Sequence, residues 1–329
     1  MSWQGKILRV NLNTHEITPE ALNMEWARDY IGERGLGTKY LWENMDPKAD
    51  AMAPDNVLIF ATGPLTGTNA STSGRYAVIT KSPLTGAIAC SNSGGKFGAE
   101  LKYAGFDLLL VEGRSEKPVY LLIEGDEISL APAEKIWGKT VWETDEWIKK
   151  QHHNPMLKIA TIGIAGERGA RYASVVNDLH RAAGRSGVGT VMGSKNLKAV
   201  ALRGTGGVKV KDPKRFMTVT QEMKNLLAEH TGGLTKYGTN AMMDTMQEFG
   251  GLPTRNFQEV QFEGADKVDA KAMMKTDDTG HTNLLTNKAC FGCTIACGRI
   301  AHIRQGELDA PAHTPTALLL VGVSRLEPL

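Results

Sequence analysis

The chain has 329 residues, of which 41% are hydrophobic and 22% charged, and its formal net charge is +2. This composition is typical of a folded globular protein, and the length allows two domains with cores of their own. A net charge so close to zero argues against nucleic acid and against an anionic membrane as partners. The sequence shows no apolar signal segment and no apolar run long enough to span a membrane, so we expect a cytoplasmic protein whose thiols stay reduced.

The chain begins with a pattern typical of β structure. Residues 6–12 alternate between apolar and polar side chains, and a turn at residues 13–14 predicts a hairpin with the segment that follows. A helical segment then leads into the glycine-rich stretch GERGLG at residues 32–37. Its order differs from the GxGxxG of dinucleotide-binding loops, and no strand immediately precedes it. We therefore interpret it as a turn with close helix packing.

The middle of the chain contains an internal repeat. A buried strand, a second strand, a glycine-rich loop leading into a helix, and a closing strand occupy residues 57–61, 74–80, 91–98 and 108–111. The same order returns at residues 159–163, 170–176, 181–189 and 199–202. Gly98 to Gly189 and Gly113 to Gly204 both differ by 91, and Arg75 to Arg171 by 96, so we interpret the repeat as a duplication.

Two such copies are expected to pair about a pseudo-two-fold axis and to bring both glycine loops to related positions on one surface. Between the copies, residues 119–130 predict a hairpin, and Thr140 with Glu143 predicts a capping box for the next helix. We interpret these intervening elements as structural.

Arginine accompanies both glycine loops. Arg75 precedes the first loop, and Arg181 and Arg185 lie in the second. Backbone N–H groups at a helix start, together with a guanidinium, suit a phosphate or the polyanionic edge of a cofactor. The alternative is that the glycines mark tight turns and the arginines form surface ion pairs.

Beyond residue 207 the pattern becomes helical. Asp212 and Pro213 predict an N-cap and a first-turn proline, and apolar residues recur at helical spacing afterwards. From about residue 303 no period remains. We predict an α+β protein with a β-rich domain at residues 1–207, a partial α-helical domain at 208–302 and an irregular tail at 303–329.

Three of the four cysteines lie within eight residues: Cys290, Cys293 and Cys297. This spacing would place them on one face of a helix. An iron–sulfur cluster fits best, while zinc with His281 or His302 as a fourth ligand and a buried trio of thiols stay open as alternatives. A disulfide is disfavoured in a reducing compartment, and the order of the gaps is the reverse of the radical-SAM spacing.

The motifs together resemble the aldehyde:ferredoxin oxidoreductase family, over roughly residues 5 to 302. They occur in the family's order: GERGLG at 32–37, GRYA at 74–77, NSGG at 92–95, RAAGR at 181–185, MGSKNLKA at 192–199, YGT at 237–239, LPTRNF at 252–257 and the three cysteines.

The resemblance implies an N-terminal duplicated β-sheet domain with pseudo-two-fold symmetry, on which two pterins lie, followed by the start of an α-helical domain. It implies a bis-pterin cofactor, tungstopterin or molybdopterin, a [4Fe-4S] cluster and Mg2+ bridging the pterin phosphates. Cys290, Cys293 and Cys297 would ligate iron. The backbone carbonyls of Asn92 and Ala182 would hold the magnesium, and Arg75 would lie between pterin and cluster. The residues implied to contact the metallopterin are Arg75, Asn92, Gly94, Arg181, Ala182, Gly184 and Arg185.

The implied activity is oxidation of an aldehyde to a carboxylic acid, with electrons leaving through the cluster to ferredoxin and a homodimer compatible with the family. The family's fourth cluster cysteine and its later pterin-binding motifs have no counterpart in this sequence, so we expect a truncated product. Cys90, the remaining thiol, is not expected to substitute. The alternatives are an inactive fragment, a cofactor-binding or electron-transfer module that needs a separate C-terminal chain, and a zinc-stabilised phosphate-binding protein.

Overall fold

The computed structural model describes residues 2–276 and 280–301, which fall into two compact units. The first unit takes in the described residues up to Thr220 together with Cys290–Gly292, and the second takes in the other described residues from Gln221 onward. The tail predicted at residues 303–329 lies outside the described residues.

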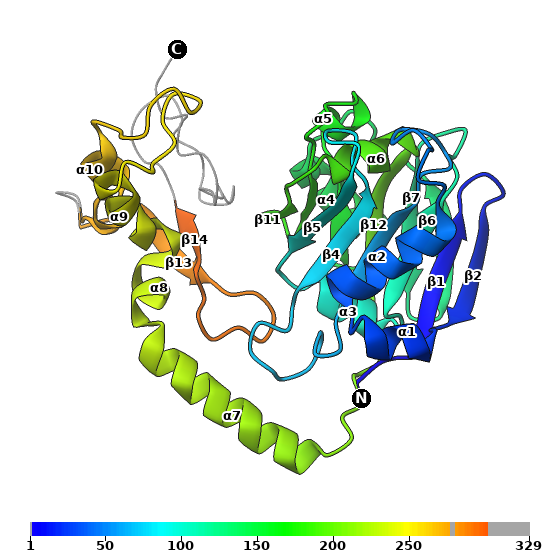
Figure 1. Cartoon of the computed structure of the whole chain (residues 1–329), viewed down its shortest axis with the longest axis horizontal. Helices are drawn as coiled ribbons and strands as arrows, with labels where there is room; N and C mark the ends of the chain where they lie inside the picture. The colour runs from blue at the N-terminus through cyan, green and yellow to red at the C-terminus, as the bar shows by residue number, and fades with distance from the viewer. Residues whose placement is uncertain (1, 277–279, 302–329) are drawn as a thin grey trace. The chain divides into compact units, whose positions relative to one another are not determined.

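The first unit contains two six-stranded sheets (Figure 1). In spatial order the first sheet consists of β2 (Glu16–Ala21), β1 (Lys6–Asn11), β6 (Leu108–Glu112), β3 (Leu58–Thr62), β4 (Tyr76–Lys81) and β5 (Ile88–Ser93). The second sheet consists of β8 (Glu127–Pro132), β7 (Val119–Glu124), β12 (Leu197–Arg203), β9 (Lys158–Thr161), β10 (Val175–Asn177) and β11 (Arg181–Ala183). Each sheet has one parallel pair, β1 with β6 and β7 with β12, and is otherwise antiparallel.

The two sheets have the same topology, which bears out the predicted duplication and extends it. The hairpin β7–β8 holds the same place in the second sheet as β1–β2 in the first. The interpretation of this hairpin as an element between the copies is therefore wrong, because its strand β7 pairs with β12 and opens the second copy. Alternating apolar residues alone do not reveal which later strand a hairpin will pair with.

Strand register fixes which residues correspond. One ladder across the first sheet runs through Leu108, Ala61, Ala77 and Asn92. The matching ladder of the second sheet runs through Ala199, Thr161, Val176 and Ala182. Asn92 and Ala182 are thus equivalent. The predicted equivalence of Arg75 and Arg171 is wrong, because counting back two residues from the equivalent positions Ala77 and Val176 makes Ser174 the counterpart of Arg75.

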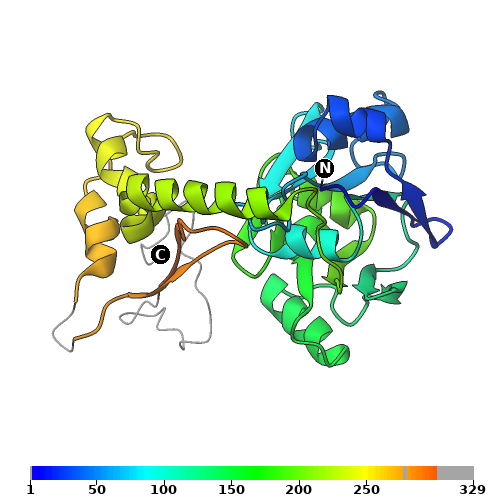
Figure 2. The same cartoon turned by 90° about the horizontal axis from the view of Figure 1, so that it is seen from below.

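The sheets face each other across a shared apolar core, to which both contribute strand residues. The helices α3 (Phe97–Tyr103) and α6 (Val188–Ser194) lie within this layer and add Phe97, Leu101, Val188, Val191 and Met192. The outer face of the first sheet is covered by α1 (Met24–Asp29) and α2 (Glu33–Asn44), and that of the second by α4 (Val141–Gln151). Figure 2 shows the blue helices α1 and α2 and the green helix α4 on opposite sides of the sheet pair. A short helix, α5 (Ile164–Glu167), follows β9.

Several local predictions hold. Thr140 and Glu143 form the expected capping box at the start of α4. Gly37 of GERGLG lets α2 lie close to the first sheet, because an added Cβ would meet Ile79 Cδ1 at 2.5 Å. Lys195 and Lys198 of the 192–199 segment are fully buried. Lys195 Nζ donates to the carbonyls of Pro54 and Gly113, so that part of the motif joins loops of the core rather than binding a ligand.

The second unit is mostly helical in its described part. It includes the end of α7 (Pro213–His230), then α8 (Gly232–Tyr237), the 3-10 helix η1 (Gly238–Met242), α9 (Met243–Glu248), α10 (Ala265–Val268) and α11 (Ala270–Met274), and a hairpin of β13 (Leu284–Lys288) with β14 (Gly298–Ala301). Asp212 caps α7 as predicted, since its Oδ1 accepts from the Arg215 amide at 3.0 Å. Of the helices in the described ranges, none combines the length and apolar character that crossing a bilayer requires.

Candidate metal and cofactor site

The two glycine loops follow strands at the edges of their sheets, and those edges meet. β5 ends the first sheet and β11 ends the second, and the two strands lie side by side (Figure 1). The amide of Arg185, just after β11, donates to Ser91 Oγ of β5 at 2.9 Å. The predicted placement of both loops on one surface follows from this junction.

Side-chain alternation decides which residues this surface presents. On β5, Ser91 and Ser93 are buried while Asn92 is exposed. On β11, Ala182 is exposed between buried neighbours. Because Asn92 and Ala182 hold equivalent places in the two copies, the surface offers two related backbone positions, one from each sheet.

Two guanidinium groups belong to the same region. Arg75 is exposed, and its Nη1 donates to Asn92 Oδ1 at 2.8 Å. Arg185 is exposed beside the exposed Gly184, where an added Cβ would meet nothing closer than Ala182 Cβ at 3.9 Å. The third predicted arginine, Arg181, differs from both because it is 7% exposed. Its guanidinium lies largely inside the unit rather than on the exposed face of β11.

Sequence reasoning missed two residues beside this surface, Glu33 and Arg34. Burial raises the pKa of the Glu33 carboxyl, and the positive charges of Arg75 and Arg34 oppose that rise. Glu33 Oε1 is buried without a hydrogen-bond partner among the described atoms. Burial also raises the pKa of the Cys90 thiol, against a side-chain hydrogen bond from Arg34. The GERGLG stretch thus contributes charge near Arg75 as well as close packing.

The cysteine segment is not a helix, so the prediction of three sulfurs on one helical face is wrong. Residues 289–297 form the irregular loop between β13 and β14. Gly292 has a φ of 64° and Ala296 a φ of 50°, both in the left-handed region that an α-helix excludes. Spacing at i, i+3 and i+7 matches a helix but does not require one.

Cys290 approaches the first glycine loop closely. An added Cβ on Gly94 would lie 2.7 Å from Cys290 Sγ. The Phe291 amide donates to the Gly95 carbonyl at 2.9 Å, and the Phe291 ring meets Tyr103 edge to face with centroids 6.0 Å apart. Residues Cys290–Gly292 are thereby fixed against the first unit. Cys90 instead packs against the core under α1 and α2.

The three cysteines are the candidate ligands of both the zinc and the iron–sulfur alternatives, and the described residues favour neither. Within residues 2–276 and 280–301, no three Cys, His, Asp or Glu side chains are arranged to hold a metal ion. Cys290 belongs to the first unit and Cys293 and Cys297 to the second. His302, considered as a fourth zinc ligand, lies outside the described residues.

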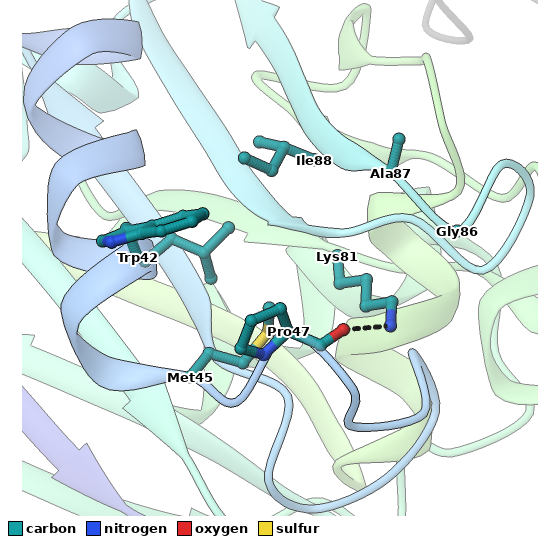
Figure 3. A pocket seen from close by; sticks show the side chains of 8 residues that line it. Trp42, Met45, Pro47, Lys81, Gly86, Ala87 and Ile88 are labelled. Atoms are coloured by element: carbon teal, nitrogen blue, oxygen red, sulfur yellow. Dashed lines mark hydrogen bonds between the residues drawn. The ribbon is translucent and has the colours of Figure 1, made fainter.

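A cavity of about 150 Å³ opens away from these residues, between α2 and the β4–β5 hairpin (Figure 3). Its lining is largely apolar, with Leu41, Trp42, Met45 and Ile88 among the residues around it. Lys81 provides its cation, and the Lys81 ammonium donates to the Pro47 carbonyl at 2.8 Å. The cavity contains none of the predicted site residues.

Comparison with known proteins agrees with the duplicated platform and the helical region after it. Residues 7–204 match the family model "Aldehyde ferredoxin oxidoreductase, N-terminal domain", and residues 218–322 match the model of its domains 2 and 3. The chain belongs to the aldehyde ferredoxin oxidoreductase family. The N-terminal match covers the two-sheet arrangement, so the six-stranded duplication is this family's N-terminal domain.

Among the relatives in the aldehyde ferredoxin oxidoreductase family, the tungsten-containing aldehyde ferredoxin oxidoreductase of Pyrococcus abyssi is 49% identical over 316 residues, which is 95% of this chain and 51% of that protein. The WOR-like subunit of an aliphatic sulfonate oxidoreductase from Pyrococcus furiosus is 29% identical and is covered to 54%. Among solved structures, the active site complex BamBC of benzoyl coenzyme A reductase, in complex with 1,5-dienoyl-CoA, matches with a TM-score of 0.80 and 30% identity, over 93% of this chain and 48% of that one. The chain spans about half the length of these relatives.

Proposed function

We propose that this chain provides the pterin platform and three cluster ligands of an enzyme that oxidises an aldehyde to a carboxylic acid at a pterin-bound tungsten or molybdenum, passing electrons through a [4Fe-4S] cluster to a ferredoxin-type acceptor. The 49% identity to a tungsten-containing aldehyde ferredoxin oxidoreductase supports the reaction class.

The observation that carries the proposal is the equivalence of Asn92 and Ala182. They occupy the same place in the two copies, are both exposed, and lie on adjacent edge strands. A ligand made of two like halves matches such a surface. The backbone carbonyls of these two residues, one from each sheet, would hold the proposed magnesium.

The surrounding residues fit an anionic, two-fold ligand. Gly184 leaves its backbone open to close approach, since no atom would contact an added Cβ at less than 3.9 Å. Arg75 and Arg185 present exposed guanidinium groups, whose planar forks suit phosphate oxygens and the heteroatom edge of a pterin. Arg181 stays in the proposed set as a buried member of the second loop.

When bound, the metallopterin would supply the oxygen-transfer and redox chemistry of the net reaction RCHO + H2O → RCOOH + 2 H+ + 2 e−. The protein's part is placement and electrostatics. Asn92 orients the Arg75 guanidinium through its hydrogen bond at 2.8 Å. Glu33, whose pKa is raised by burial, lies within the electrostatic reach of Arg75, so its protonation state sets how much positive charge this region carries.

The cysteine segment would hold the cluster. Cys290, Cys293 and Cys297 are the proposed iron ligands, because closely spaced cysteine thiolates hold iron–sulfur clusters. The bond from the Phe291 amide to the Gly95 carbonyl fixes the residue next to Cys290, so the first ligand is positioned before iron arrives.

The test is anaerobic purification from cells supplied with tungstate and molybdate, followed by elemental analysis and electron paramagnetic resonance of the dithionite-reduced protein. About four irons per chain, with tungsten or molybdenum and aldehyde-dependent reduction of a ferredoxin or viologen dye, would support the proposal. Metals without aldehyde oxidation would indicate a cofactor-binding module that needs a partner chain. Zinc alone, or no metal, would refute it.

A further inference from the structure

The last residue of β10, Asn177, carries a buried amide that holds the first glycine loop. Asn177 is 1% exposed, and its side chain makes four hydrogen bonds. Its Oδ1 accepts from Tyr76 Oη at 2.9 Å and from Ser93 Oγ at 2.7 Å. Its Nδ2 donates to the Gly94 carbonyl at 2.9 Å and to Asp178 Oδ2 at 2.8 Å. A residue of the second copy therefore fixes the end of β5 in the first.

Asp178 holds the residue on the other side of Gly95 through a hydrogen bond. Its Oδ2 accepts from the Lys96 amide at 2.7 Å as well as from Asn177. The Gly94 carbonyl and the Lys96 amide are thus both bonded to this pair. Asp178 has a φ of 49° and Leu179 a φ of 64°. Residues other than glycine adopt the left-handed region at a cost, and the surrounding contacts must hold them there.

Gly95 explains why the pair can lie so close. Its φ is +91°, and an added Cβ would meet Asp178 Oδ2 at 2.2 Å and Asn177 Nδ2 at 2.6 Å. On its other side, the Gly95 carbonyl accepts from the Phe291 amide, and Gly94 lies against Cys290 Sγ. The same short turn therefore contacts Asn177 and Asp178 on one side and the cysteine segment on the other.

This arrangement is specific to the first copy. Gly184, the counterpart of Gly94, faces open space except for Ala182 Cβ at 3.9 Å. Strand register places Val78, an apolar residue, at the first-copy position that corresponds to Asn177. The two copies share topology, yet the amide and carboxylate that grip a loop come from the second copy alone.

We infer that Asn177 and Asp178 are positioning residues for the metal centre, which hold the Gly94–Gly95 turn in the one conformation that seats Cys290 beside the cofactor surface. The inference rests on the proposed function. Neither residue needs to touch iron or pterin, because each acts through the Gly94 carbonyl or the Lys96 amide.

The test uses point variants of the full chain. Asn177→Asp keeps an acceptor for Tyr76 and Ser93 but replaces the donor to the Gly94 carbonyl with a second acceptor. Asp178→Ala removes the acceptor for the Lys96 amide, and Asp178→Asn restores one. Tyr76→Phe is the matched control, since it removes a bond to the same Asn177 oxygen without affecting either bond to the turn.

The first readout needs no cofactor. It is the rate at which iodoacetamide alkylates Cys290, measured relative to the rate at Cys90 in metal-free protein below its unfolding temperature. Losing one hydrogen bond shifts a local opening equilibrium by about 2- to 12-fold. We expect Cys290 to react faster by a factor in that range in Asn177→Asp and Asp178→Ala. Its rate should stay unchanged in Tyr76→Phe and return toward the parent value in Asp178→Asn.

The second readout is iron content with the cluster resonance spectrum, which should deteriorate in the same two variants. Unchanged Cys290 alkylation in both would overturn the inference, as would an equal rise in Tyr76→Phe, because the effect would then be general stability. If the parent chain binds no iron, tungsten or molybdenum, the proposed function fails, while alkylation still decides whether the pair positions Cys290.

Discussion

Replacing Gly94 with alanine should displace the first cluster cysteine. The φ of Gly94 is not in the left-handed region, so its backbone conformation is open to alanine. The obstacle is steric, because the new Cβ would lie 2.7 Å from Cys290 Sγ. Ordinary contacts between such atoms begin near 3.5 Å, so the sulfur must retreat by roughly 1 Å. Overpacking of this kind costs about 1–3 kcal/mol, which weakens the docking of the segment roughly 5- to 150-fold.

The assay is iron per chain after anaerobic purification, with the resonance spectrum of the reduced protein and a thermal melt to check folding. Gly207→Ala is the matched control, because it adds the same methyl group to a glycine outside the proposed site, where an added Cβ would meet nothing within 4 Å. We expect the first variant to lose iron and the second to keep it. Full iron and an unaltered spectrum in Gly94→Ala would refute the reasoning, and so would equal losses in both variants.

Three further outcomes follow from other contacts. Burial lowers the pKa of Lys195 to about 7. Between pH 7 and the ordinary lysine range the unfolded chain therefore binds more protons than the folded chain, so the free energy of unfolding should rise with pH by at most about 1.4 kcal/mol per unit. Lys195→Met should flatten that rise, and equal changes in the urea-unfolding free energy of parent and variant between pH 7 and 9 would contradict this prediction. Asp107→Asn should lower the free energy of unfolding in urea by about 3–5 kcal/mol, because it leaves the fully buried Lys102 without its carboxylate partner at 2.5 Å. Glu146→Gln removes the carboxylate from the exposed pair with Lys150 and should cost under about 1 kcal/mol. Similar losses in both variants would show that burial does not set the cost of breaking the pair. Arg75→Lys keeps the charge but loses the planar fork, so tungsten or molybdenum content should fall while the melting temperature holds, and undiminished metal would count against a role for Arg75 in cofactor binding.

The duplication could be predicted from the sequence because glycines recur at the same spacing in both copies. Gly98 and Gly189, like Gly113 and Gly204, occur where a side chain would strike backbone or a neighbouring residue, so their spacing survives in both copies. Arg75 and Arg171 are both exposed, so packing does not fix the position of either arginine in its copy. For a surface arginine, only strand register identifies the equivalent residue in the other copy.

The grip of Asn177 and Asp178 on the Gly94–Gly95 turn could not be predicted from the sequence. It joins residues more than eighty positions apart and depends on β5 meeting β11, which no local pattern encodes. The helix prediction for the cysteine segment was wrong for a related reason. Its helical spacing is a local signal, whereas its conformation follows from hydrogen bonds and packing made against distant glycines.

The order in which the strands pair has a consequence for synthesis on the ribosome. β1 cannot form its parallel pair until β6 has emerged about a hundred residues later, so the first sheet closes late, after a long loop has been spanned. Even then its inner face lacks the second sheet, whose side chains complete the shared core. A nascent chain that stalls once β6 has left the ribosome would carry a complete first sheet with one bare apolar face, which is a substrate for chaperones and a seed for aggregation.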